Sequence, residues 1–275
     1  MKAWYQAKQK QEEYLSNADD ILADLDGGIL RITFNRPEAR NALTFEMYER
    51  LASLCEDADT NSDVRAILIT GAGGKAFAAG TDISQFKAFR TPQDALEYED
   101  NITRILDSVE NCGKPIIAAI AGACTGGGAA IAACSDLRIA AEGMRFGYPV
   151  ARTLGNCLSM SSYARLVALV GVACVKDLIF TARLMGAQEA KAVGLVNEVV
   201  SDHAELMVRA EEVARTVASH APLTLRVSKE ALRRLRSKPG ADEGNDLVTR
   251  CYMSHDFREG ISAFLEKRQP VWTGT

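Results

Sequence analysis

Three consecutive glycines, residues 126–128, are the part of the sequence best suited to chemistry. They follow an apolar stretch at residues 115–120 and precede a run of small residues typical of a short buried helix. Glycine has no Cβ, so the backbone can approach a ligand closely at such a turn. The first turn of a helix also presents unpaired N–H groups and the positive end of the helix dipole. The sequence therefore predicts a site for a developing negative charge.

A second loop has the same character. Residues 71–85, GAGGKAFAAGTDISQ, follow another apolar stretch at residues 65–70 and consist largely of small residues. Asp82 and Ser84 are typical of residues that cap a helix. Two strand-to-loop units of this kind suggest that two backbone N–H groups could converge on one oxygen atom. The sequence leaves that convergence open.

Other interpretations of the glycine turn compete with this one. Residues 115–135 carry no charge and are about as long as a membrane span, but Pro115, the glycines and the alanines would make a poor lipid-facing helix. The turn could also be only a tight junction between a strand and a helix. A nucleotide site is disfavoured, because neither GxGxxG nor GxxxxGK[ST] occurs here.

The composition limits the class of protein. With 275 residues, 47% of them hydrophobic, the chain can bury one large core, with or without an appended helical segment. The net charge of −4 argues against a nucleic-acid partner, and the basic residues 226–238 are better explained as the solvated face of a helix. Seven cysteines form no CxxC pair, and residues 1–20 lack the apolar core of a signal peptide. We therefore expect a cytoplasmic protein with no membrane partner.

The elements that must position the two loops follow from hydrophobic periodicity and turn residues. A hairpin is predicted at residues 21–34, and Thr44 should cap a helix whose buried side includes Met47, Leu51 and Cys55. From residue 144 a loop leads into a helix that continues over 172–180, and beyond residue 201 the pattern is mostly helical. Strands are predicted at 65–70, at 115–120 and after Asp136, and a short helix followed by a strand is predicted within 186–200. The other predicted helices are at 92–109, 204–220, 223–235, 245–253 and 257–267.

Several motifs, in order along the chain, carry a family resemblance. They are NRPEARNAL, AFAAGTDISQF, KPIIAAIAGACTGGG followed by CSDLRIAA, MRFGYP, GAQEAKAVGLVNEVV and HDFREGISAFLEKRQP. Together they resemble the crotonase superfamily, whose best-known member is enoyl-CoA hydratase. The resemblance extends from about residue 21 to the end of the chain.

The resemblance implies an α/β fold, built as a spiral of ββα units over residues 1–200, with an N-terminal extension at about residues 1–17. It implies a helical trimerisation region at residues 201–275 and a homotrimer, or a hexamer made of two trimers. The implied ligand is an acyl-CoA thioester. Coenzyme A would be part of the substrate, and neither a separate cofactor nor a metal is expected.

The resemblance also implies which residues form the site. The backbone amides of Thr81 and Gly127 should hold the thioester oxygen. Other residues match the parts of the family that line the CoA arm, and among them Arg40 is expected to approach a CoA phosphate; they are Ala39, Arg40, Ala79, Asp82, Ile83 and Ser84. The polar residues that could project into the acyl pocket are Tyr148, Arg152 and Asn156. Phe257 and Lys267 match positions that reach CoA in some relatives, but packing and surface charge are their expected roles here.

Two positions depart from the family pattern. Hydratases of this family carry one glutamate two residues after the glycine turn and a second directly after Phe-Gly-x-Pro. This chain has Ala130 and Val150 at those positions. Each acid–base role in a reaction of this kind is worth about 10²–10⁴ in rate.

Three hypotheses remain open at this point. The chain could be an enoyl-CoA hydratase or isomerase that uses substitute residues. It could be an acyl-CoA decarboxylase acting on a malonyl-type ester, because loss of CO₂ generates the enolate without a base. It could also be a CoA-binding assembly subunit that has no catalytic activity.

Overall fold

The larger of two β-sheets has the strand order β1-β2-β3-β5-β7-β10. The computed structural model describes residues 20–88, 90–236 and 254–275. In the described part of this sheet, only β1 and β2 pair antiparallel, joined at Gly27 and Gly28, whose positive φ angles suit a tight hairpin turn. The strands of this sheet are β1 (Ile21–Asp26), β2 (Ile29–Phe34), β3 (Ala66–Gly71), β5 (Ile116–Ile120), β7 (Leu137–Ala141) and β10 (Glu198–Val200).

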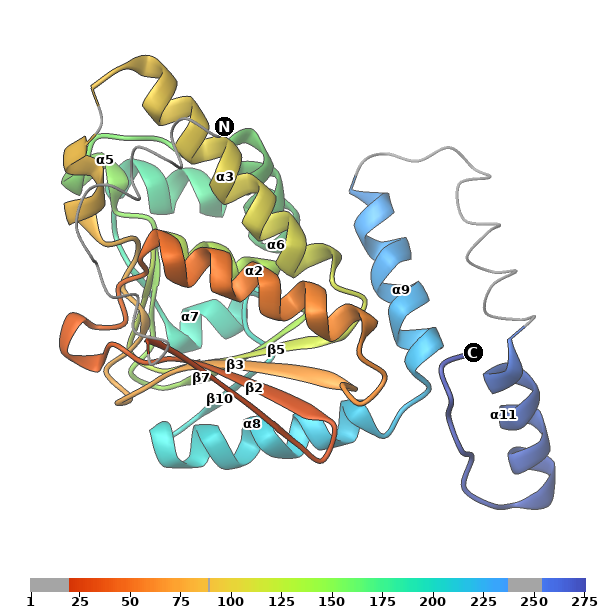
Figure 1. Ribbon diagram of the computed structural model, residues 1–275. Helices are drawn as coiled ribbons and strands as arrows, with labels where there is room; N and C mark the ends of the chain where they lie inside the picture. Colours follow the sequence, from red (N-terminus) through yellow and green to blue (C-terminus); the bar gives the residue numbers. More distant parts are fainter. Residues whose placement is uncertain (1–19, 89, 237–253) are drawn as a thin grey trace.

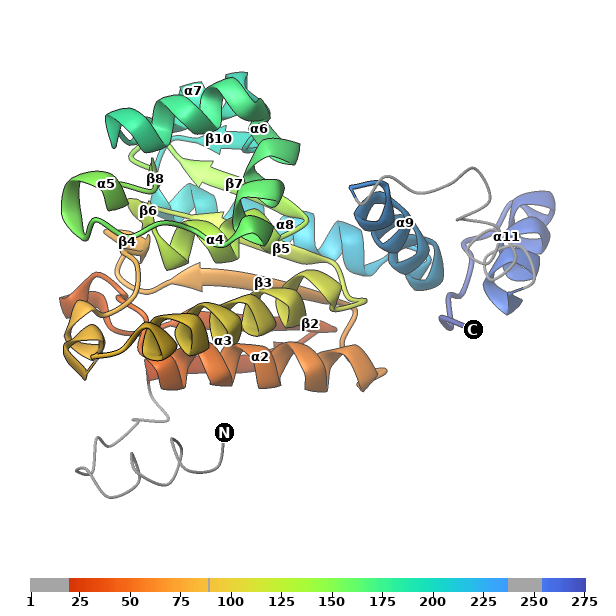
Figure 2. The ribbon, with the colours of Figure 1, turned by 90° about the horizontal axis from the view of Figure 1, so that it is seen from above.

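The smaller sheet has the order β4-β6-β8-β9 and is made of strands only two or three residues long. Its first three strands run parallel, and β9 pairs antiparallel with β8. Figure 2 shows β4, β6 and β8 gathered near α4 and α5, at the end of the molecule opposite α9. The strands are β4 (Ala76–Ala78), β6 (Ala123–Thr125), β8 (Arg145–Gly147) and β9 (Met185–Gly186).

Helices cover both faces of the larger sheet (Figure 1). Side chains alternate along β3, so that Ile67 and Ile69 face the core beneath α2 and α3, whereas Leu68 faces α8. The helices of this first part of the chain are the short 3₁₀ turns η2 (Pro37–Ala39) and η3 (Ile83–Ala88), and α2 (Phe45–Thr60), α3 (Pro92–Asn111) and α4 (Gly127–Cys134). The later helices are α5 (Val150–Thr153), α6 (Met160–Thr181), α7 (Ala187–Ala192), α8 (His203–Ala218), α9 (Pro222–Leu235) and α11 (His255–Glu266).

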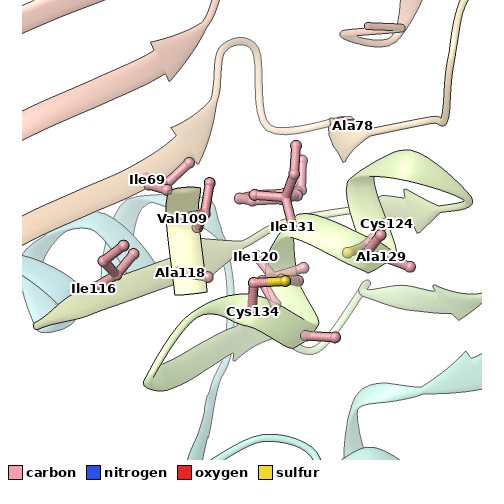
Figure 3. Packing of buried hydrophobic residues seen from close by; sticks show 14 of the residues in the cluster. Ile69, Ala78, Val109, Ile116, Ala118, Ile120, Cys124, Ala129, Ile131 and Cys134 are labelled. Carbon is pink, nitrogen blue, oxygen red and sulfur yellow. The ribbon is translucent and has the colours of Figure 1, made fainter. Parts of the chain in front are cut away.

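Helix α4 is buried almost along its whole length. All its residues after Gly127 are buried, and Ile131 packs among Ile69, Val109 and Ile120 (Figure 3). Its alanines and Cys134 leave little side-chain volume, which lets the helix lie close to β4 and β6. The N-terminal end of α4 is therefore held in a fixed position at the edge of the smaller sheet.

Most of the predicted elements are confirmed. The hairpin, the strands at 65–70 and 115–120 and the helix capped by Thr44 are present, and the Thr44 side chain accepts a hydrogen bond from the Met47 amide. The loop predicted at residues 71–85 differs, because it contains β4 and the start of η3. A three-residue strand is too short for its periodicity to be recognised in the sequence.

The predicted C-terminal helical region has two parts. Helix α8 packs on β3, β5 and β7 through Leu206, Ala210 and Ala214. Helices α9 and α11 lie beyond the edge of the sheets (Figures 1 and 2). The helix predicted at residues 245–253 lies outside the described residues. Among the described helices, none is both long and apolar enough to span a membrane.

Candidate active site

The two small-residue loops predicted from the sequence follow neighbouring parallel strands. Strand β4 pairs with β6 through Ala76↔Ala123 and Ala78↔Cys124. Parallel strands end at the same edge of a sheet, so the segment after Ala78 and the glycine turn after β6 leave the sheet side by side. This pairing is what brings the two halves of the predicted site together.

The loops touch. A Cβ built on Gly126 would lie 3.5 Å from the Cα of Gly80, and one built on Gly127 would lie 3.3 Å from the Thr81 Oγ1. Gly126 has φ 52° and ψ −118°, a conformation that favours glycine. The structure therefore brings Thr81 and Gly127, the two residues predicted to supply amides, into direct proximity.

The amides of Thr81 and Gly127 are both available to a ligand. The Leu43 amide donates to the Gly80 carbonyl, and the Leu43 carbonyl accepts from the Asp82 amide, at 2.8 Å in each case. Thr81 lies between Gly80 and Asp82, so its own N–H points away from Leu43. Gly127 is the first residue of α4, where N–H groups have no partner within the helix. Within the described residues, neither amide donates a hydrogen bond.

Asn41 fastens the preceding polar loop to the loop after β3. Its side chain is fully buried and donates to the Ala72 and Ala76 carbonyls at 3.0 and 2.7 Å, while its Oδ1 accepts from the Arg36 amide. The sequence interpretation missed this residue. The available signal was its type, because asparagine readily adopts the positive φ of 54° found here.

Asp82, predicted to line the CoA arm, also has partners within the protein. Its carboxylate accepts from the Ser84 hydroxyl at 2.7 Å and the Ser84 amide at 3.1 Å, and Arg36 contacts it at 3.2 Å. The Ser84 hydroxyl, followed by Arg36, holds the pKa of Asp82 below its usual value. Asp82 therefore orders the start of η3 and ties it to the loop that carries Arg36.

The Thr81 side chain lies between two tyrosine hydroxyls. Its Oγ1 is 2.9 Å from the Tyr48 Oη and 3.1 Å from the Tyr98 Oη. Burial raises the pKa of Tyr48 well above its usual range and raises that of Tyr98 to about 12, so both phenols are protonated at neutral pH. The sequence interpretation missed both tyrosines.

The remaining predicted binding residues are spread over different environments. The Ala79 amide donates to the Arg40 carbonyl at 3.1 Å, which places Ala39 and Arg40 beside the loop after β4. Residues whose side chains are exposed are Arg40, Ile83, Ser84, Arg152 and Asn156. Tyr148, in contrast, is buried against Phe146, and its hydroxyl has no partner in the described part of the chain.

Ala130 and Val150 are both buried, each with 8% of its surface exposed. Ala130 lies one turn into α4, and Val150 is the first residue of α5. Lys267 is exposed just after α11, whereas the side chain of Phe257 lies outside the described residues.

Comparison with known proteins agrees with this architecture. A family model described as enoyl-CoA hydratase/isomerase matches residues 24–275. A short-chain-enoyl-CoA hydratase of Clostridium acetobutylicum is 34% identical over 255 residues, covering 91% of this chain and 96% of that protein. A crotonyl-CoA hydratase of Syntrophomonas wolfei is 32% identical over 263 residues, with coverages of 91% and 96%.

Solved structures also resemble this chain. A crystal structure described as an enoyl-CoA hydratase/carnithine racemase from Magnetospirillum magneticum superposes with a TM-score of 0.87 and 34% identity, covering 94% of this chain and 96% of that one. The predicted crotonase-type α/β fold is thus confirmed. The chain belongs to the enoyl-CoA hydratase/isomerase family.

Proposed function

We propose that this protein processes an acyl-CoA thioester through an enolate whose oxygen is held by the amides of Thr81 and Gly127. The observation that carries the proposal is the meeting of the two loops at the N-terminal end of α4, with both N–H groups unpaired in the described chain. Coenzyme A enters as part of the substrate.

The physical basis is electrostatic. Donors fixed before the reaction stabilise an oxyanion without having to reorganise, and removing one such donor costs about 3–4 kcal/mol. The dipole of α4 adds a positive potential at the same place. Because both donors belong to the backbone, they persist whatever side chains surround them.

The names of the relatives suggest the substrate class. Proteins that resemble this chain are named short-chain-enoyl-CoA hydratase and crotonyl-CoA hydratase, and we extend a short acyl-CoA to this chain by analogy. Arg40 is exposed beside the Ala79 loop, where its guanidinium can meet a CoA phosphate. We propose this contact for Arg40.

We also propose assembly into trimers. Several large apolar side chains on α6 and α9 are exposed in the single chain, which is typical of a surface covered by another subunit. They are Val172, Phe180, Leu232 and Leu235. Gel filtration with light scattering should give three or six times the 29.8 kDa of one chain.

Decarboxylation is a second candidate reaction. The motif positions that carry glutamates in hydratases of the family hold buried apolar side chains here, Ala130 and Val150. Adding water to a double bond needs a base that activates the water. Loss of CO₂ from a malonyl-type ester needs only a stabilised enolate and a proton donor.

Assays on purified protein separate these possibilities. Hydration of crotonyl-CoA, release of CO₂ from methylmalonyl-CoA and binding of butyryl-CoA should be measured on the same preparation. Turnover of either reactive ester supports the proposed function and identifies the reaction. Tight binding of butyryl-CoA without turnover of either ester would instead indicate an assembly subunit.

A further inference from the structure

Three hydroxyl groups form a continuous chain beside the two amides. The Tyr48 Oη, Thr81 Oγ1 and Tyr98 Oη are linked by contacts of 2.9 and 3.1 Å. They come from α2, the loop after β4, and α3, respectively. Tyr48 is 1% exposed and Tyr98 is half-buried, so the chain runs from the interior towards the surface of the protein.

The inner end of this chain lies against the glycine turn. A Cβ on Gly127 would lie only 1.7 Å from the Tyr48 Oη, so the phenol occupies the space directly beside the Gly127 Cα. The amide of the same residue is one of the two proposed oxyanion donors. An acyl group whose thioester oxygen meets that amide therefore has the Tyr48 hydroxyl as a close neighbour.

The direction of the hydrogen bonds can reverse. Three hydroxyls carry three protons, and two of these form the two bonds within the chain. When Tyr98 donates to Thr81 and Thr81 donates to Tyr48, the Tyr48 proton is free to point towards Gly127. Either tyrosine oxygen can act as the donor in its contact with Thr81.

Two aromatic rings pack on the outer end of the chain. Phe45 and Phe86 pack on Tyr98 with ring centroids 5.6 and 5.0 Å away. Glu99 follows Tyr98 on α3, and burial raises the pKa of its carboxyl.

We propose that Tyr48 donates the proton that converts the thioester enolate into product, and that Thr81 and Tyr98 relay its replacement. This inference rests on the function proposed above. In the step, the enolate electron pair forms a new C–H bond at the α-carbon while the Tyr48 O–H bond breaks. The Thr81 and Tyr98 protons each move one place inward, and Tyr98 regains a proton from solvent, so the protein ends unchanged.

The test compares three substitutions that each remove one phenol hydroxyl. Tyr48→Phe removes the donor, Tyr98→Phe removes the end of the relay, and Tyr163→Phe on α6 is the matched control. Turnover is measured in D₂O with whichever of crotonyl-CoA or methylmalonyl-CoA the unmodified protein converts, and the face of the α-carbon that receives deuterium is determined by NMR. The absorbance of 4-dimethylaminocinnamoyl-CoA moves to longer wavelength when its thioester oxygen is polarised. Binding of this ester therefore tests the pair of amides independently of turnover.

We expect Tyr48→Phe to lower turnover by about 10²-fold or more and to place deuterium on both faces of the α-carbon. Tyr98→Phe should lower turnover by about tenfold, and Tyr163→Phe should leave it unchanged. The absorbance shift should persist in all three variants.

Two results would overturn the proton donor while leaving the proposed function intact. One is a Tyr48→Phe variant with turnover within twofold of the unmodified protein. The other is a variant that loses both turnover and the absorbance shift, which would make Tyr48 part of the scaffold. Absence of the shift in the unmodified protein would refute the oxyanion site itself, and the proton donor with it.

Discussion

The hydroxyl oxygen of Tyr48 lies 1.7 Å from the point that a Cβ would occupy at Gly127. The Gly127 φ is not in the left-handed region, so an alanine there would be compatible with the backbone and would fail mainly through this contact, with the Tyr48 Cζ and the Thr81 Oγ1 also close, at 3.0 and 3.3 Å. A side chain of the protein itself therefore requires glycine at this position.

Substituting Gly127→Ala should destabilise the protein by about 1–3 kcal/mol, because Tyr48 is buried and hydrogen-bonded and has little room to move. Adding Tyr48→Phe should recover at least half of that loss, since the clashing oxygen is gone. Urea unfolding of the two single variants and the double variant measures the coupling. Strictly additive effects would mean that the two residues are not in contact.

Asn41→Ala should lower the free energy of unfolding by about 2–4 kcal/mol. The change leaves the Ala72 and Ala76 carbonyls without their buried donor and places alanine at a positive φ. Asn61→Ala is the control, because Asn61 is exposed at the C-terminal end of α2 and should change stability by less than about 1 kcal/mol. Equal effects of the two substitutions would contradict the role given to Asn41.

Asp82 should make stability depend on pH. Its folded pKa lies below the ordinary value of 3.8, so its ionised form stabilises the fold above that pH, and this contribution disappears as pH falls through the folded pKa. Thermal unfolding should show Asp82→Asn less stable than the unmodified protein at pH 7 and equally stable near pH 2. A stability difference that stayed constant over this range would argue against the ionised contacts with Ser84 and Arg36.

Tyr148→Phe should leave the free energy of unfolding unchanged or raise it by up to about 1 kcal/mol. The Tyr148 hydroxyl is buried with no partner in the described chain, so its removal loses no hydrogen bond seen there. Tyr48→Phe should instead lower stability by about 1 kcal/mol, because it loses the contact with Thr81. If Tyr148→Phe abolished turnover with stability unchanged, the Tyr148 hydroxyl would act on the substrate, as the sequence interpretation allowed.

Local signals in the sequence were sufficient for much of the fold. Thr44 is recognisable as a cap because its type and the apolar spacing after it are properties of neighbouring residues. The meeting of Thr81 with Gly127 depends instead on the pairing of β4 with β6, and strands of three mostly small residues carry no periodicity that predicts a partner. The motif resemblance supplied both positions, but their proximity required the fold.

The two tyrosines that the sequence interpretation missed share one property. Tyr48 lies on the same buried side of α2 as Leu51 and Cys55, and a tyrosine there is normally explained as core packing. Its hydroxyl becomes informative only when the fold brings to it Thr81, which lies 33 residues further along the chain, and with Thr81 its second partner Tyr98. Interactions of this kind are set by tertiary structure and leave no local pattern.

The central claim is that the amides of Thr81 and Gly127 share one thioester oxygen. A crystal structure with bound butyryl-CoA, a saturated ester that neither hydrates nor decarboxylates, measures this directly. The account predicts the thioester oxygen within about 3.2 Å of both nitrogen atoms. A thioester oxygen held elsewhere, with either nitrogen more than about 4 Å away, would contradict it.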